Sequence, residues 1–471
     1  MNDLLKKAYS AEGFKKDARL IADMVAEQFA AAQSGKQEKA IEYKAPEQEL
    51  KIWEDDFNDK NPITIEELAG KIFDNTLSFH NRGYMGHQVS VTMPVTALTA
   101  EIIAYLSHST TVYELGMAGN AMEKVVITHM AEKYGYEKGA TGVVTSGGSL
   151  GNLTALVTAR TSSGISEDDY GNLAIMTSVE SHYSVSRAAS IMGIKSDNII
   201  FVPSDDDFKV RTDLLEPLYQ EAVNAGKKVF CVVGCACTTA VGAYDDLEAI
   251  ADFAERHDIW FHVDGAHGAA AIFSEKYKGF LKGVERSDSI VVDFHKMMMV
   301  PALSTAVIYN AGKRKINEKV PNAKYLWQDQ RSLEWYNSAK HTMECTKPAT
   351  IIHTYAIMRL YGDKIYEEYV DTLYDLGIEF GKMIEETPDM ELAFKPCTNI
   401  VCFRYVPENG KDINEVNRKI ADELLKDGTF YIVNTTVRDK FYLRVSLMNP
   451  MTDKETLEEL LDKIKRLAGA V

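Results

Sequence analysis

The chain has 471 residues, of which 45% are hydrophobic and 26% are charged. This composition is typical of a globular protein with a large core, and the length allows more than one domain. The formal net charge is −17, so the chain as a whole lacks the positive field that attracts nucleic acids or anionic membranes. We therefore expect neither a nucleic acid nor a membrane as a partner.

The cysteine content indicates a reducing compartment, and the apolar runs match neither a signal peptide nor a membrane span. Six cysteines in a chain of this length form no disulfide framework. The cluster of Cys231, Cys235 and Cys237 lacks the Cys-x2-Cys spacing and the nearby histidine of a zinc site, so no metal is expected. The N-terminus has no apolar signal core, and the longest uncharged run, 229–244, is short for a membrane span. We predict a cytoplasmic protein.

The N-terminal part of the chain is predicted to be helical. Within residues 15–33, apolar side chains recur every four positions, which predicts an amphipathic helix. Residues 36–60 are polar and contain proline, and we expect a connecting arm there. A further helix is predicted to begin near Thr64, because Glu66 and Glu67 would lie in its first turn, where the helix dipole favours acids.

Short apolar runs alternate with helical patterns from about residue 120 to residue 310. This alternation predicts an α/β fold with a mostly parallel sheet wrapped by helices. The runs are apolar at nearly every position, which indicates that both faces of the sheet are buried. The predicted strands are TGVVT (141–145), LAIMTS (173–178), NIIFVP (198–203), KVFCVVG (228–234), IWFHVD (259–264) and SIVVDF (289–294).

The pattern changes again after the predicted sheet. Residues 312–346 carry many charges and have no clean period, which predicts a long surface loop of the kind that often serves function. From residue 347 onward the pattern is that of mixed helices and strands. The last helix is predicted from a capping box of Thr452 and Glu455, followed by apolar residues at helical spacing.

Polar residues that follow the predicted strands are candidate site residues, because ligands of open parallel sheets bind at the carboxyl ends of the strands. Ser-Gly-Gly-Ser (146–149) stands between a strand and a helix, where backbone N–H groups could hold a phosphate. The segment is neither a Walker A motif nor Gly-x-Gly-x-x-Gly. On its own, a Gly/Ser turn before a helix is more often only a turn and a cap.

An acid and a lysine follow two other predicted strands. Asp264 ends the strand at 259–264, and Lys296 follows the strand at 289–294. Each alone is more often a strand-end residue that faces water. Together with the glycine turn, they match the amine, the carboxylate and the anion cradle that pyridoxal 5′-phosphate requires. We expect burial beside apolar neighbours to lower the pKa of Lys296, which would favour the neutral amine.

The sequence resembles the group II pyridoxal-phosphate decarboxylases, the family of glutamate, cysteine sulfinate, diaminobutyrate and aromatic-amino-acid decarboxylases. The resemblance implies decarboxylation of an L-amino acid and a fold of type I, which is the aspartate-aminotransferase type. It also implies a homodimer with a shared active site. The motifs that carry it, in the family order, are TSGGSLGN (145–152), SHYSVSRAA (181–189), HVDGAHG (262–268), VDFHK (292–296), NIVCFRY (399–405) and FYLRVSLMNP (441–450).

This family fold implies a division of the chain into three parts. We expect an N-terminal helical arm at 1–65 and a small C-terminal domain at 347–471. The large cofactor-binding domain would cover 66–346 and would include a catalytic loop near 312–346.

The resemblance also assigns roles around the cofactor. Lys296 would bind it covalently, and Asp264 would pair with the pyridine nitrogen. His182 would stack on one face of the ring and Ala266 would pack on the other. Thr238 would lie near the ring hydroxyl. The phosphate would be held by Gly148, Ser149 and His295.

Two further roles concern the substrate. Arg444 matches the family arginine that grips the substrate α-carboxylate, and this grip would turn the bond to be broken perpendicular to the ring. In the family, a tyrosine on a mobile loop usually protonates the α-carbon. Tyr336 is our candidate for this acid, with Tyr325 in the same segment as the alternative. The loop is expected to act either in its own subunit or in the partner's site.

Two segments depart from the family pattern. Many members have Asn where this chain has Asp293, and an acid near a phosphate is unfavourable unless it faces away or hydrogen-bonds elsewhere. Members of the diaminobutyrate type have a similar Asp-Phe-His-Lys run. Cysteines at 235 and 237 replace residues of the usual Gly-Thr-x-Gly-Thr-Thr segment that contains Thr238.

The substrate is predicted from residues 84–94, where the family lines its side-chain pocket. His87 and Gln88 are polar and could hydrogen-bond a carboxylate or a sulfinate, which favours glutamate, aspartate or cysteine sulfinate. A diaminobutyrate or aromatic substrate is the alternative. An aldehyde synthase or lyase on the same fold, and a non-catalytic binding or scaffold protein, are the other hypotheses. Intact Lys296 and Asp264 disfavour the last of these.

Overall fold

The computed structural model describes residues 2–313, 334–407 and 410–470 of the chain. These residues form two compact units. The large unit comprises Gln88–Ile378 and Phe394–Val401, and the small unit comprises Met1–His87, Glu379–Ala393 and Cys402–Val471. The small unit therefore takes its chain from both ends of the sequence.

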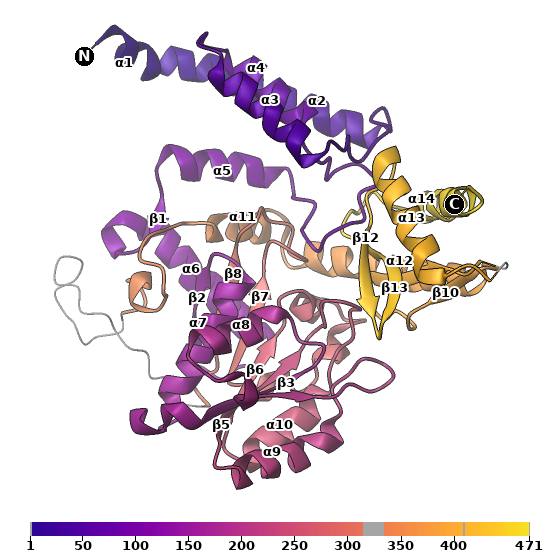
Figure 1. The fold of residues 1–471 in the computed structure, drawn as a ribbon. Coiled ribbons are helices and arrows are strands. Elements are labelled where there is room, and N and C mark those ends of the chain that lie inside the picture. Colours follow the sequence, from indigo (N-terminus) through magenta and orange to yellow (C-terminus); the bar gives the residue numbers. More distant parts are fainter. Residues whose placement is uncertain (1, 314–333, 408–409, 471) are drawn as a thin grey trace. The chain divides into compact units, whose positions relative to one another are not determined.

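A sheet of seven strands forms the centre of the large unit (Figure 1). Strands β3 to β7 pair in parallel, whereas β8 pairs antiparallel with both β2 and β7. The predicted α/β class with a mostly parallel sheet is confirmed, although β8 was not predicted. From edge to edge the strands are β2 (Thr141–Thr145), β8 (Thr305–Tyr309), β7 (Ser289–Asp293), β6 (Trp260–Asp264), β5 (Lys228–Cys235), β3 (Leu173–Ser178) and β4 (Ile199–Val202).

Helices cover both faces of this sheet, which explains why its strands are apolar throughout. Val233 on β5 joins one core cluster with α7 (Gly148–Ser162) and α8 (Tyr183–Ile191). The next residue, Gly234, approaches Ile250 on α10 (Leu247–Arg256). Successive strand residues point to opposite faces, so α10 lies across the sheet from α7.

The remaining elements of the large unit surround this core. The short strands β1 (Ser109–Thr110) and β9 (Lys347–Pro348) form a separate antiparallel pair. The other helices are α5 (Val95–Tyr105), α6 (Tyr113–Lys133), α9 (Leu215–Asn224), α11 (Ile351–Tyr361) and α12 (Lys364–Glu385), the last of which runs on into the small unit.

The small unit has its own four-stranded sheet, in the order β10-β11-β13-β12 (Figure 1). Its strands are β10 (Met390–Leu392), β11 (Ile400–Tyr405), β12 (Val433–Val437) and β13 (Lys440–Ser446), and the first two residues of β11 are counted with the large unit. Its helices are α1 (Asp3–Ala8), α2 (Ala11–Gln33), α3 (Pro46–Asn58), α4 (Ile65–Asp74), α13 (Ile413–Asp427) and α14 (Lys454–Ala468). Across the described part of the chain, no helix combines the length and the apolar character that crossing a membrane requires.

The prediction of a connecting arm at 36–60 is wrong, because α3 lies within it. Pro46 occupies the first turn of α3, the one place in a helix where the missing N–H of proline costs nothing. The predicted start of α4 is confirmed. Thr64 caps this helix and forms a reciprocal capping box with Glu67, whose carboxylate accepts from the Thr64 backbone N–H at 2.7 Å.

The predicted capping box of the last helix is also wrong. Asp453, and not Thr452, caps α14, because its carboxylate accepts a hydrogen bond from the Thr456 backbone N–H at 2.9 Å. The Thr452 hydroxyl instead donates to the Arg82 carbonyl at 2.8 Å. Glu455, the expected partner of Thr452, is exposed in the first turn.

We expect Asp453→Ala to lower the free energy of unfolding by about 1 kcal/mol, because the first N–H groups of α14 lose their acceptor. Glu455→Ala is the matched control and is expected to change this free energy by less than about 0.5 kcal/mol. Urea denaturation followed by circular dichroism measures both. Equal losses, or a larger loss for Glu455→Ala, would contradict the cap seen in the structure.

Candidate active site

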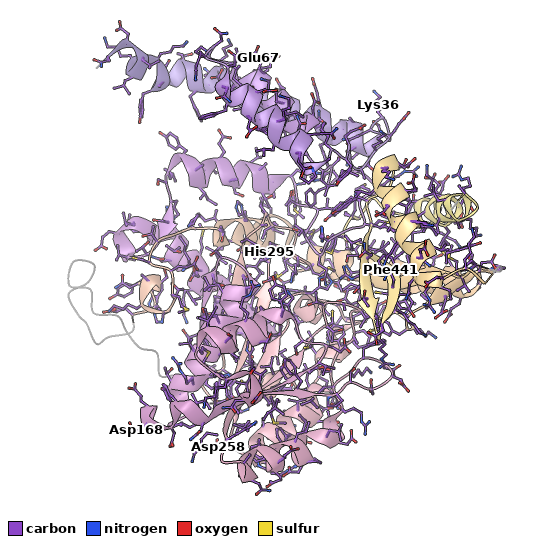
Figure 2. All side chains as sticks on the ribbon, in the orientation of Figure 1. Lys36, Glu67, Asp168, Asp258, His295 and Phe441 are labelled. Carbon is purple, nitrogen blue, oxygen red and sulfur yellow. The ribbon has the colours of Figure 1, made fainter. Side chains whose placement is uncertain are left out.

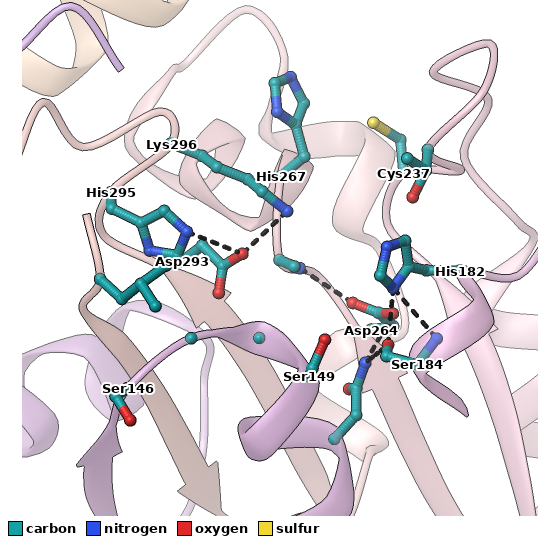
Figure 3. A pocket seen from close by; sticks show the side chains of 16 residues that line it. Ser146, Ser149, His182, Ser184, Cys237, Asp264, His267, Asp293, His295 and Lys296 are labelled. Carbon is teal, nitrogen blue, oxygen red and sulfur yellow. Dashed lines mark hydrogen bonds and ion pairs between the residues drawn. The ribbon is translucent and has the colours of Figure 1, made fainter. Parts of the chain in front are cut away.

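A cavity of about 250 Å³ opens in the large unit at the carboxyl edge of the central sheet (Figure 3). Its walls come from the turn after β2, the start of α8 and the segments that follow β5, β6 and β7. Parallel strands end at the same edge, which is why residues distant in sequence meet here. The predicted site residues that line it are Gly148, Ser149, His182, Asp264, Ala266, His295 and Lys296.

The carboxylates of this cavity and His295 lie in the interior of the protein. His295 is only 6% exposed and is surrounded by side chains, whereas Asp168 and Asp258 lie at the surface of the same unit (Figure 2). Asp264 is likewise 6% exposed. Burying charged and polar groups is costly unless each finds a partner, so the partners of these residues show how the site is held together.

Lys296 forms an ion pair with Asp293, the last residue of β7. The Lys296 Nζ lies 2.8 Å from Asp293 Oδ2, and His295 Nε2 lies 3.7 Å from the same oxygen (Figure 3). The other oxygen, Oδ1, accepts a hydrogen bond from the Thr305 hydroxyl. Thr305 stands opposite Asp293 in the β7–β8 register, so the pairing of the strands supplies this donor.

The expectation of a lowered pKa for Lys296 is wrong. Burial does favour the neutral amine, but the carboxylates of Asp293 and Asp264 outweigh it and raise the pKa of Lys296 above its ordinary value. Burial likewise disfavours the charged form of Asp293, which by itself would raise the pKa of this acid. The neighbouring Lys296 and His295 nevertheless hold the pKa of Asp293 below its usual range. The pair is therefore ionised in the cofactor-free chain.

His182 presents one defined face to the cavity. Its Nδ1 accepts from the Ser184 backbone N–H at 3.2 Å and lies 2.7 Å from the Ser184 hydroxyl. Because Nδ1 accepts, the ring proton of the neutral tautomer belongs to Nε2. Burial lowers the pKa of His182, which keeps the ring neutral. A neutral, flat ring at the wall of the cavity suits stacking on another flat ring.

Asn152 joins three walls of the site, and sequence reasoning did not single it out. Its amide nitrogen donates to Asp264 Oδ2 at 3.0 Å and to the Ser184 hydroxyl at 2.9 Å. Its amide oxygen accepts from His262 Nε2 at 3.0 Å. One amide therefore fixes Asp264 and also Ser184, the residue that orients His182. The signal available in the sequence was its place in the first turns of the helix after the glycines.

His262 backs this arrangement from beneath the cavity. It stands two residues before Asp264 on β6, so both side chains point to the same face of the sheet. Its Nδ1 lies 2.8 Å from the Ser289 hydroxyl, which also accepts from Trp260 Nε1 at 2.9 Å. Burial lowers the pKa of His262 to about 4, so the ring is neutral and acts as a hydrogen-bonding support.

The glycine turn forms a cradle at the start of α7. Gly147 has a φ of +105°, a conformation that other residues rarely adopt. A Cβ on Gly148 would lie 2.9 Å from Asp293 Oδ1, so only glycine allows this close approach. The first N–H groups of a helix have no partner within the helix. With the Ser149 hydroxyl beside them, these groups can hold an anion.

Thr238 is not among the residues that line the cavity; its neighbour Thr239 is. The Thr238 hydroxyl accepts from the Ala243 backbone N–H at 3.0 Å, and the Thr238 N–H donates to the Ala243 carbonyl at 2.8 Å. Thr238 therefore ties together the turn after β5. Its predicted position near the ring hydroxyl stays a prediction.

The candidate loop acid lies away from the described cavity. Tyr336 is partly buried and packs edge-on against Tyr113, with 5.6 Å between the ring centroids. It does not belong to the cavity lining formed by residues 2–313, 334–407 and 410–470. The alternative, Tyr325, lies outside the described residues. The role of either tyrosine stays a prediction.

Gln88 carries a buried polar atom that lacks a partner. Its Nε2 is buried and has no hydrogen-bond partner in the described chain. The segment that follows it runs beside the segment that contains His295, because the Ser90 N–H donates to the His295 carbonyl at 3.0 Å and the Met93 N–H donates to the Met299 carbonyl at 2.9 Å. A buried donor without an acceptor is costly, so it marks a place where a ligand or water is expected.

His87 and Arg444 belong to the small unit. His87 contacts Tyr431 there, and Arg444 acts on His87 through its charge. His87 Nε2 lies 3.0 Å from the Tyr431 hydroxyl. Burial and then the positive charge of Arg444 lower the pKa of His87. Tyr431 was not predicted, although Gly86 approaches its ring so closely that a Cβ there would lie 2.4 Å away. The glycine next to His87, a predicted substrate residue, was the available signal.

Comparison with known proteins identifies the same chemistry. Residues 46–406 match the family model of the pyridoxal-dependent decarboxylase conserved domain. An acidic amino acid decarboxylase of Xenopus tropicalis is 28% identical, with 91% of this chain and 88% of that protein covered. An aromatic-L-amino-acid decarboxylase of Bacillus atrophaeus is 29% identical over 77% of this chain and 76% of that protein. A crystal structure from Vibrio parahaemolyticus, the glutamate decarboxylase domain of a diaminobutyrate-pyruvate transaminase and L-2,4-diaminobutyrate decarboxylase, is 26% identical with a TM-score of 0.85, covering 98% and 97% of the two chains.

We expect Asn152→Ala to weaken binding of pyridoxal 5′-phosphate by about tenfold or more, because Asp264 loses the amide that orients it and buried donors lose their partners. Titration of the apoprotein, followed by visible absorbance, measures this affinity.

Asn310→Ala is the matched control for this prediction. Asn310 is a buried asparagine of the same unit, and its amide oxygen accepts from the Glu137 N–H at 3.2 Å while its amide nitrogen donates to the Glu285 carbonyl at 3.3 Å. The control is expected to lower the melting temperature but to keep the cofactor affinity within about twofold. Equal affinities in both variants would show that the Asn152 network has no part in the site.

Proposed function

Because the chain belongs to the family of pyridoxal-dependent decarboxylases, we propose that it removes the α-carboxylate of a small acidic L-amino acid. The reaction class follows from the family: the protein is a carboxy-lyase that uses pyridoxal 5′-phosphate and acts on an amino acid. The proposal concerns the substrate, for which we name glutamate, aspartate or cysteine sulfinate. The products are carbon dioxide and the corresponding amine.

The lining of the cavity fits this cofactor. It offers an amine at Lys296, a carboxylate at Asp264 and a cradle at Gly148 that a Cβ would fill. When bound, the cofactor supplies an electron sink for the electron pair left on the α-carbon as carbon dioxide departs. We assign Lys296 to covalent attachment and Asp264 to the ring nitrogen. Gly148, Ser149 and His295 are assigned to the phosphate.

The chain itself keeps these groups in place. The Asp264 carboxylate accepts from the Asn152 amide at 3.0 Å and from the Ala266 N–H at 3.3 Å, so it has one orientation. A fixed carboxylate favours a proton on a nitrogen beside it, which is the state that withdraws electrons best. The neutral ring of His182 is assigned to one face of the cofactor, and Ala266 to the other.

Two further roles are assigned from the family resemblance. A guanidinium can hold a carboxylate through two parallel hydrogen bonds, and we assign Arg444 to the substrate α-carboxylate on that basis. The direction in which this carboxylate is held decides which bond to the α-carbon breaks. Tyr336, with Tyr325 as the alternative, would return a proton to the α-carbon. An aldehyde synthase on the same fold would instead release an aldehyde and peroxide.

The observation that carries the acidic assignment is the unpaired donor at Gln88. Its buried Nε2 has no acceptor among the described residues, and its segment is hydrogen-bonded to the segment that contains His295. A side-chain carboxylate or sulfinate of the substrate would supply that acceptor. An aromatic ring would leave the donor unpaired at a cost of about 1–3 kcal/mol. His87, next in the chain, is a second polar residue, and its Nε2 lies 3.0 Å from the Tyr431 hydroxyl.

A diaminobutyrate substrate is the second candidate, because a similar Asp-Phe-His-Lys run occurs in that branch and a diaminobutyrate decarboxylase of Acinetobacter baumannii is 26% identical. Its terminal ammonium would need an acceptor. Of the carboxylates that line the described cavity, Asp264 is assigned to the ring nitrogen and Asp293 accepts from the Thr305 hydroxyl. This occupation favours the acidic substrate.

We also propose a homodimer, as the resemblance implies. One face of α5 carries large apolar side chains that the single chain leaves in water. Leu98 is 59% exposed, Ile102 52% and Tyr105 76%, and they recur at helical spacing. Exposed apolar stripes of this kind mark interfaces, and a second copy of the chain is the partner we infer. In such a dimer, Tyr336 would act either in the site of its own subunit or in the site of the partner subunit.

The substrate assignment predicts the outcome of a panel assay. With cofactor bound, we expect carbon dioxide release from L-glutamate, L-aspartate or L-cysteine sulfinate to exceed that from 2,4-diaminobutyrate and from aromatic amino acids by about tenfold or more in kcat/KM, which corresponds to one charge-assisted hydrogen bond. Release of carbon dioxide with amine, and without peroxide, identifies decarboxylation.

Lys296→Ala is the control for this panel and is expected to lose both the visible cofactor band and the activity. A protein that kept both would contradict the assignment of Lys296. The highest kcat/KM with diaminobutyrate or an aromatic amino acid would contradict the acidic substrate while leaving Lys296 untouched.

Gln88 gives a separate prediction about specificity. We expect Gln88→Leu to raise KM for the acidic substrate by about tenfold, because the distal acid loses a hydrogen-bond donor. Gln88→Glu should raise it further through like-charge repulsion. The cofactor band and the melting temperature are measured alongside and should stay within the range of the parent. Unchanged KM values in both variants would remove Gln88 from the substrate pocket.

A further inference from the structure

A buried carboxylate lies within the anion cradle itself. Asp293 is 2% exposed, and its two oxygens would lie 2.9 and 3.0 Å from a Cβ on Gly148, the first residue of α7. Its partners are the Lys296 ammonium at 2.8 Å, the His295 ring at 3.7 Å and the Thr305 hydroxyl. The carboxylate thus engages the positive groups that surround the glycine turn.

These groups are the ones that an incoming phosphate needs. The start of α7 provides partial positive charge, and His295 and Lys296 lie beside it in the cavity lining, His295 assigned to the phosphate and Lys296 to covalent attachment. A phosphate that reaches them also comes close to the Asp293 carboxylate. Two anions in a buried site repel each other more strongly than in water, because the surrounding dielectric constant is low. An asparagine at the same position would have nearly the same shape and no charge.

Other charged groups do not cancel this repulsion. Lys296 is also faced by Asp264, whose charge adds to that of Asp293 in raising the pKa of the lysine. His182 contributes no positive charge, because burial lowers its pKa. Among the described residues that line the cavity, Lys296 therefore faces two carboxylates, Asp293 and Asp264, before any phosphate enters.

We propose that Asp293 is a positioning residue that holds Lys296 in the cofactor-free chain and lowers the affinity of the site for the phosphate of its cofactor. The proposal rests on the assignment of Lys296 as the cofactor lysine. Its consequence is a holoenzyme that loads and releases pyridoxal 5′-phosphate more readily than an enzyme with a neutral residue at this position. Activity would then follow the supply of cofactor.

The test compares pyridoxal 5′-phosphate with pyridoxal, which lacks the phosphate, on apoprotein of the full chain. We expect Asp293→Asn to bind pyridoxal 5′-phosphate at least about tenfold more tightly than the parent. Its affinity for pyridoxal should rise much less, so that the ratio of the two dissociation constants increases. Fluorescence titration measures both constants, and inorganic phosphate alone should compete more effectively in the variant.

Asp363→Asn is the matched control. Asp363 pairs with Lys133 at 2.7 Å and with His129 at 2.9 Å in the same unit, so the substitution removes a carboxylate from a similar pair outside the cavity. It is expected to leave both dissociation constants unchanged. Asp293→Ser provides a second neutral variant should the asparagine protein fail to fold.

Three outcomes would overturn the proposal. The affinity of Asp293→Asn for pyridoxal 5′-phosphate could be unchanged or weaker. Its affinity for pyridoxal 5′-phosphate and for pyridoxal could rise equally, which would show that the substitution acts through Lys296 and not through the phosphate. Asp363→Asn could show the same gain. Borohydride reduction followed by peptide mapping tests the premise separately, because a label on a lysine other than Lys296 would refute the cofactor assignment whatever the affinities show.

Discussion

The site depends on the parallel pairing of β6 with β7 at the centre of the large sheet. Asp264 is aligned with Val291, so the carboxyl ends of both strands reach the same edge of the sheet. Asp293 ends β7 there, and Lys296 follows within one turn of chain. A slip of one residue would turn every side chain of β7 to the opposite face and remove Asp293 from the cavity. The register of the backbone therefore determines where the chemistry can occur.

The central sheet could be predicted because helices on both of its faces require apolar residues at nearly every strand position. The strands at 141–145 and 173–178 have the predicted bounds. The antiparallel β8 escaped detection because it follows β7 without a helix between them, so the strand–helix alternation gives no signal. The helix α3 was missed because a polar stretch that contains proline was interpreted as a connecting arm, whereas proline fits the first turn of a helix.

The candidate residues that the cavity brings together could be anticipated, since Asp264, Lys296 and the glycine turn each end or follow a predicted strand. The residues that support them could not be anticipated. Asn152 and His262 acquire their roles only through hydrogen bonds between elements that the sequence does not align. The pKa of Lys296 was predicted in the wrong direction because burial was considered without the neighbouring carboxylates. In a buried site, the sign of such a shift depends on the nearest charges more than on desolvation alone.

The position of β8 between β2 and β7 has a consequence for the growing polypeptide. At the edge of the sheet, β2 pairs with β8 alone, and β3 to β7 come between these two strands in the chain. A domain can begin to fold while the ribosome is still extending it. On a nascent chain that stops before β8, Asp264 and Lys296 could already be in place, but the strand that leads into the glycine turn would have no neighbour. The half of the site that the glycine turn forms is therefore expected to form last during synthesis.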